Sequence, residues 1–269
     1  MTTTVLTNDL SARSISAVSL KTAARLWFLV AVIGQWAFLY YIVAFYASPT
    51  LQGNFRAWSR NTDLFKGYVA GDTLGNLSFG AHIMLAAVIA FGGALQLVPW
   101  IRTRAMPIHC WNGRVFMLTA LGASLSGLYL VWVRGGPNLI GALTISLNAL
   151  LIIGFVILAW RSARARRIEA HRRWAMRAYL VANGQWFFRV GLFGMMLFNR
   201  AWVGPFYLFW GVGCYLVPLG VLELYLRIQD RAGSRARVAM AGGLLVLTAL
   251  MGIGIVGVYL VAWRPLLVG

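Results

Sequence analysis

The sequence predicts an all-α protein, a polytopic transmembrane bundle of about seven spans. Hydrophobic residues make up 60% of the 269 residues and charged residues only 11%, whereas a soluble domain carries about 25% charged residues. The apolar residues also form long runs, and most basic residues lie between those runs. These observations exclude an ordinary soluble globule. We expect a cytoplasmic N-terminal tail over 1–23 and one membrane domain over 24–269.

Seven apolar runs are long enough to cross a bilayer, since a spanning helix needs roughly 20 residues for a ~30 Å hydrocarbon core. The first run is too long for the core of a signal peptide, and no small-residue cleavage site follows it, so we expect it to stay in the mature protein. The seven expected spans are Ala24–Ala47, Leu77–Pro99, Gly113–Val133, Leu139–Trp160, Ala175–Phe198, Phe206–Leu226 and Val238–Trp263.

Basic residues are unevenly distributed between the two sides of this bundle. Of the 24 Lys and Arg residues, 17 lie in the N-terminal tail or around the second, fourth and sixth connections, and six lie on the other side. The positive-inside rule therefore predicts a cytoplasmic N-terminus, seven crossings and an external C-terminus. The net charge of +18 comes from basic residues that lie between the apolar runs and set the orientation of the protein in the membrane. We therefore expect the lipid bilayer, and not a nucleic acid, as the partner of these residues.

The one long connection on the other side, Ser48–Asn76, mixes aromatic and charged residues. Two interpretations fit this composition. The segment forms a short helix that lies on the membrane surface, or it folds into a cap on the bundle.

Two histidines, His109 and His171, precede spans that start from the arginine-rich side, and an arginine follows each of them. Histidines on facing helices are common axial ligands of haem, and arginine suits carboxylate groups. This pattern predicts one haem b bound by His109 and His171, with Arg114 and Arg177 on its propionates. A second haem is not expected, because two bis-histidine haems need four histidines and the chain has three.

Arg189 lies inside the expected fifth span, where a charge is costly and usually functional or paired. Gln185 shares its stripe of the helix, and His82 and Asn148 lie at comparable depth on other spans. We therefore expect an outer-side cluster of His82, Asn148, Gln185 and Arg189 that binds an anionic or polar ligand. The alternative is a hydrogen-bonded network that only fixes helix packing.

Acidic residues are scarce, and Glu223 is the one acid within a span. Arg227 follows it by one helical turn, so we expect an ion pair between them. The adjacent His109 and Cys110, together with His171, leave a copper or other soft-metal site open as a smaller possibility.

Four motifs lie along the middle of the chain: Ala81-His82, Gly92-Gly93-Ala94-Leu95-Gln96, His109…Asn112-Gly113-Arg114 and Ala170-His171-Arg172-Arg173-Trp174-Ala175-Met176-Arg177. With these motifs, residues 77–200 resemble DUF2306, a family of polytopic bacterial membrane proteins. The resemblance implies a multi-pass protein of the bacterial inner membrane but no activity, and it marks His82, His109, Arg114, His171, Arg177 and Arg189. Two positions depart from the family pattern: Cys110 stands where Arg is usual, and Ala175 interrupts a Trp-Met pair.

Two classes of function follow from these residues. The first is a b-type haem protein that transfers electrons, with quinone or another membrane redox protein as its partner. The second is a non-catalytic membrane protein, a carrier or assembly factor that binds a lipid or an anionic solute. The sequence leaves open whether the protein is an enzyme.

Overall fold

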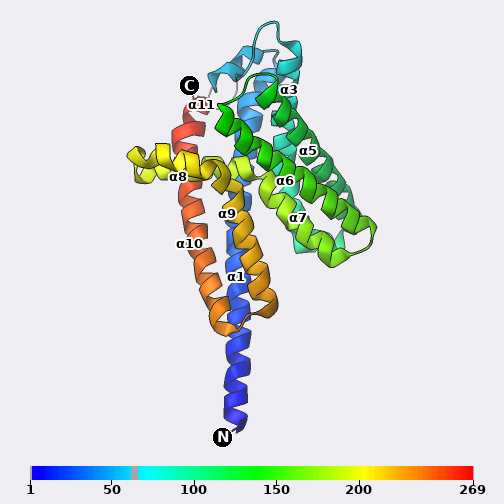
Figure 1. The fold of residues 1–269 in the computed structure, drawn as a ribbon, viewed down its shortest axis with the longest axis vertical. Coiled ribbons are helices and arrows are strands. Elements are labelled where there is room, and N and C mark those ends of the chain that lie inside the picture. Colours follow the sequence, from blue (N-terminus) through cyan, green and yellow to red (C-terminus); the bar gives the residue numbers. More distant parts are fainter. Residues whose placement is uncertain (1, 62–65, 269) are drawn as a thin grey trace.

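The computed structural model describes residues 2–61 and 66–268, with side chains from residue 16 onward. Within these residues every regular element is a helix, which confirms the all-α prediction. Figure 1 shows long helices, with the two chain termini near opposite ends of the molecule. The connections α6–α7 and α9–α10 lie at the end nearer the N-terminus, which we call the arginine-rich end. The other end is the cap end.

The elements, in chain order, are α1 (Thr2–Ile42), the π-helix η1 (Val43–Ala47), α2 (Ser48–Leu51), the 3-10 helix η2 (Phe55–Arg60), α3 (Thr73–Leu97), α4 (Pro99–Arg104), α5 (Met106–Trp132), α6 (Leu139–Arg164), α7 (Ile168–Ala182), α8 (Gly184–Phe198), the 3-10 helix η3 (Arg200–Trp202), α9 (Val203–Arg231), α10 (Ser234–Val258), the π-helix η4 (Tyr259–Trp263) and α11 (Arg264–Val268).

Six of the seven expected spans coincide with helical segments that are long and apolar enough to cross a membrane. These segments contain α1, α3, α5, α6, α9 and α10, so the hydropathy pattern predicted their existence and type. Residues 2–23 of the expected tail belong to α1, which is helical from Thr2. In Figure 1 this part of α1 projects beyond the other helices.

The fifth expected segment, Ala175–Phe198, differs from the prediction because it is not one continuous helix. Its residues fall in α7 and α8, each of 15 residues and thus about 22 Å long, too short to cross alone. The break lies at Asn183, whose side-chain amide donates to the Tyr179 carbonyl at 2.8 Å. Figure 1 shows α8 running across the direction of α1 and α10.

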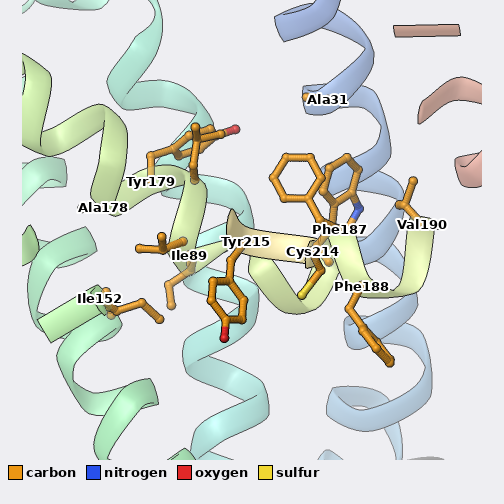
Figure 2. Packing of buried hydrophobic residues seen from close by; sticks show 14 of the residues in the cluster. Ala31, Ile89, Ile152, Ala178, Tyr179, Phe187, Phe188, Val190, Cys214 and Tyr215 are labelled. Carbon is orange, nitrogen blue, oxygen red and sulfur yellow. The ribbon is translucent and has the colours of Figure 1, made fainter. Parts of the chain in front are cut away.

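The helices also pack tightly at the break. A Cβ atom on Gly184 would lie only 3.2 Å from Tyr215 Cβ and from Asn148 Nδ2. A residue with a side chain would therefore require these neighbours on α6 and α9 to shift by a few tenths of an ångström. Figure 2 shows the surrounding core, in which Ile152, Tyr179 and Tyr215 are among the buried residues.

The long connection forms a cap, not a separate surface helix. Trp58 in η2 is buried, its indole nitrogen donates to Thr50 Oγ1 at 3.1 Å, and its ring packs against Phe79 of α3. Arg134, which follows α5, donates to Asp72 Oδ2 and to the Gly67 carbonyl, both at 2.8 Å. The cap is thus held to the ends of α3 and α5.

We expect Asp72→Asn to destabilise the cap and to weaken the dependence of its stability on pH. Asp72 accepts from the Gly75 backbone at 2.9 Å, and the hydrogen bond from Arg134 holds the pKa of this carboxyl below its usual value. The stabilisation is therefore present above about pH 4, the usual Asp pKa, and is lost as the pH falls through the lower folded pKa. Thermal unfolding in detergent at pH 7 and pH 3 tests this. Asp230→Asn is the control, and an equal effect of both variants would contradict the prediction.

Candidate functional site

The arginine-rich half of the bundle contains a large cavity of about 1590 Å³. Its walls come from α1 and from the helices α3 to α10. Most of its lining is apolar, including Phe116, Leu180 and Met251. A cavity of this size exceeds the ~300–1,000 Å³ typical of sites for small ligands, so it has room for a large and mainly apolar group.

His109 of α5 and His171 of α7 both line this large cavity. They are close enough to interact electrostatically. His171 Nδ1 lies 3.0 Å from the Ala159 carbonyl oxygen, and because a carbonyl only accepts, this nitrogen donates and Nε2 remains available. His109 Nδ1 is buried without a hydrogen-bond partner among the described residues. The structure therefore places both histidines of the haem prediction in the lining of one cavity.

Arg114 and Arg177, the two arginines expected on the haem propionates, differ in their positions. Arg114 lines the large cavity, but Arg177 does not. Arg177 instead binds Glu223 of α9 in a bidentate pair, with Nε–Oε1 at 2.6 Å and Nη2–Oε2 at 2.8 Å, and it packs over the Trp174 ring. Arg177 thus joins α7 to α9 and is not in position for a ligand. The expected Glu223–Arg227 pair is also wrong, because the carboxylate faces α7.

Glu223→Gln is expected to lower the free energy of unfolding by about 1–2 kcal/mol, since charge-assisted hydrogen bonds are stronger than neutral ones but partial exposure weakens them. The Arg177 side chain is only 15% exposed, so its charge would lose its partner without gaining full hydration. Chemical denaturation in detergent measures the change. The matched control is Glu169→Gln, because Glu169 is 65% exposed in its pair with Arg173, and a larger loss in this control would contradict our interpretation.

Three further arginines of the large cavity, Arg102, Arg164 and Arg172, were not singled out from the sequence. All three lie in or beside the basic connections, where the topological role of arginine hides any binding role. Only the fold shows that Arg102 from α4 and Arg172 from α7 face the same space. Arg102 and Arg114 form no ion pair with any residue that the structure describes.

A second, smaller cavity of about 170 Å³ lies toward the cap end. All four residues of the predicted polar cluster line it: His82 of α3, Asn148 of α6, and Gln185 and Arg189 of α8. The structure thus brings together residues that are more than 100 positions apart in the chain. Sequence reasoning missed Tyr41, Asn183 and Trp186, which also line this cavity and which by spacing alone resemble ordinary buried or interfacial residues.

The hydrogen bonds of this smaller cavity are only partly formed. Arg189 Nη1 donates to the Gln185 carbonyl at 2.9 Å, and the guanidinium packs against the Phe38 ring. His82 Nδ1 lies 3.0 Å from the Ala123 carbonyl oxygen and 3.1 Å from Ser126 Oγ. No carboxylate pairs with Arg189 anywhere in the described part of the chain. The cavity therefore holds a positive charge that has no counter-ion there.

Residues suited to a compact metal site do not come together. Cys110 is exposed and free, and Cys214 is buried and free. Over residues 2–61 and 66–268, no group of three or more His, Cys, Asp or Glu side chains could hold a metal ion. A site with only two histidine ligands, as in a bis-histidine haem, falls outside that criterion.

The family model of DUF2306, described as a predicted membrane protein, matches residues 79–226. The chain belongs to the DUF2306 family. The matched region contains His109 and His171 of the large cavity and His82 and Arg189 of the smaller one. Both cavities are therefore built largely from the family's part of the chain. No curated protein and no solved structure matches the chain.

Proposed function

We propose that this DUF2306 protein binds one b-type haem in the large cavity, with His109 and His171 as axial ligands, and that it transfers electrons within the membrane. The observation that supports the proposal is that these two histidines, from α5 and α7, line the same large and mainly apolar cavity. Imidazoles on different helices of a bundle are the usual ligand set for a haem held between helices.

The hydrogen bonds of the two rings fit this role. Ligand histidines generally donate their second nitrogen to a carbonyl or carboxylate, which fixes the ring and raises its basicity. His171 has this arrangement through Ala159. His109 has a buried nitrogen with no partner, and a bound ligand would account for it. Both rings therefore have a nitrogen that the described protein leaves unused.

The charges around the cavity also suit a haem. Haem carries two propionates, and Arg102, Arg114 and Arg172 supply positive charge from three different helices. Arginine binds carboxylates through paired, charge-assisted hydrogen bonds. Arg177 has no part in this binding, because Glu223 occupies it.

A bound haem would supply one-electron chemistry, and the protein would supply the ligands, the charges and an apolar surround. The apolar lining suits an exchange partner that moves in the bilayer, and we propose a quinone or another membrane redox protein. The basic residues at this end would lie in the cytoplasm under the positive-inside rule, so electron exchange with the haem would take place on the cytoplasmic side.

The visible spectrum of the protein purified in mild detergent tests the proposal. We expect a Soret band in the oxidised protein and sharp α and β bands after dithionite reduction. A protein that stays colourless after expression with added haem precursor would contradict haem binding. Lipid bound in the large cavity, identified by native mass spectrometry of such a colourless protein, would then support the second class of function, a lipid-binding membrane protein.

A further inference from the structure

The smaller cavity is separate from the proposed haem site and has a different chemistry. It lies toward the cap end and shares no lining residue with the large cavity. Its polar side chains include residues of α1, α3, α5, α6 and α8. It therefore needs an explanation of its own.

Arg189 gives this cavity its charge. Its guanidinium has five N–H donors, and the described protein supplies one hydrogen bond, to the Gln185 carbonyl, and one ring contact, with Phe38. Arg189 is close enough to interact electrostatically with His82 and Tyr41, and neither of these residues supplies a negative charge at neutral pH. A charge at such a position is costly unless it is paired, so the cavity favours an anion.

Two further side chains have unused polar atoms. Asn148 and Trp186 both line the cavity and are 5% and 2% exposed. Asn148 Oδ1 and Trp186 Nε1 are buried without a hydrogen-bond partner among the described residues. Buried polar groups are nearly always satisfied in native proteins, so both atoms are open to a further polar partner. Trp186 Nε1 can only donate, as Arg189 does, and both therefore suit a negatively charged acceptor. Asn148 Oδ1 can only accept, so a carboxylate does not satisfy it and it needs a separate donor.

The volume of the smaller cavity and the residues that line it limit which ligands it can bind. An apolar cavity of about 150 Å³ holds benzene, so 170 Å³ admits a molecule of roughly ten non-hydrogen atoms. Phe38, Tyr41 and Phe79 give the cavity an aromatic wall. A lipid is too large for this space, and a bare inorganic anion would leave the aromatic wall without contacts.

We propose that the smaller cavity binds a small organic monocarboxylate, with its carboxylate on Arg189 and its apolar body against the aromatic wall. This inference does not depend on the haem proposal, because no residue and no measurement is shared. It assigns to Arg189 a binding role and not only a role in helix packing.

Isothermal titration calorimetry of the purified full-length protein with benzoate tests the site. We expect saturable binding of benzoate and at least tenfold weaker binding of benzamide, which has a similar shape but no charge. Arg189→Gln is expected to weaken benzoate binding at least tenfold. Arg200→Gln is the matched control, since Arg200 is exposed on η3 and lines neither cavity, and it is expected to bind benzoate like the wild type.

A second variant protects the test against misfolding of Arg189→Gln. Ala86→Leu changes no charge and fills the cavity from α3, so a monodisperse Ala86→Leu protein is expected to lose benzoate binding. Equal affinity for benzoate and benzamide, unchanged benzoate binding in the folded Arg189→Gln protein, or no benzoate binding by the wild type would each overturn the proposal.

Discussion

His171→Ala is expected to abolish haem binding, leaving less than roughly a tenth of the Soret absorbance of the wild type, because a haem held by two protein ligands loses half of its axial coordination. His171 also connects two helices, since its ring in α7 donates to the Ala159 carbonyl of α6 at 3.0 Å. The reduced-minus-oxidised spectrum per mole of protein, with size-exclusion chromatography to verify folding, measures the loss. His109→Ala is expected to have the same effect.

The remaining histidine provides the control for this experiment. His82 lies in the smaller cavity and interacts with Ala123 and Ser126 of α5, so His82→Ala is expected to keep the haem spectrum. A spectrum lost in His82→Ala and retained in His171→Ala would move the haem to the other cavity and contradict the proposed ligands. The three single variants therefore locate the site as well as test for it.

Gly254→Val is expected to cause the largest loss of stability of any substitution considered for this protein. A Cβ atom at Gly254 would lie close to the Val190 carbonyl oxygen, and Gly194 of α8 packs directly against Gly254 Cα of α10. Overpacking a core costs about 1–3 kcal/mol when side chains can adjust, and here the obstacle is backbone. We therefore expect the variant to separate α8 from α10 and to yield little monodisperse protein.

Gly252→Val is the matched control for this prediction. Gly252 lies two residues away on the same helix, and a Cβ atom there would meet nothing within 4 Å. Its thermal midpoint in detergent is expected to stay close to that of the wild type. A comparable loss in both variants would show that glycine in α10 matters for the helix itself and not for its contact with α8.

Hydropathy predicted most of the fold because a bilayer requires long apolar helices, and a polar residue exposed to its hydrocarbon core costs free energy. The sequence also supplied both sets of candidate residues, since an arginine such as Arg189 inside an apolar run stands out without any structure. Other features were not predictable. At the break between α7 and α8, the Asn183 side-chain amide donates to the Tyr179 carbonyl. The pair Asn183-Gly184 permits this hydrogen bond but does not require it, so the sequence did not predict the break.

The sequence also did not predict which arginine pairs with Glu223. Glu223 could pair with Arg227 on its own helix or with Arg177 on another, and spacing favours the nearer residue. The structure selects Arg177 because α7 and α9 pack together and a bidentate pair across them satisfies both oxygens. The sequence therefore offered Arg177, which pairs with Glu223, and overlooked Arg102, Arg164 and Arg172 of the large cavity.

The sequence by itself determined that this protein is a helical membrane protein, where six of its long apolar helices lie, and which polar residues within apolar runs call for an explanation. The tertiary structure alone decided which of those residues share a cavity: His109 and His171 line one, and His82, Asn148 and Arg189 line another. The reason is physical. The cost of burying a residue is a property of that residue and its immediate neighbours in the chain, whereas the partners that offset this cost are set by how separate helices pack.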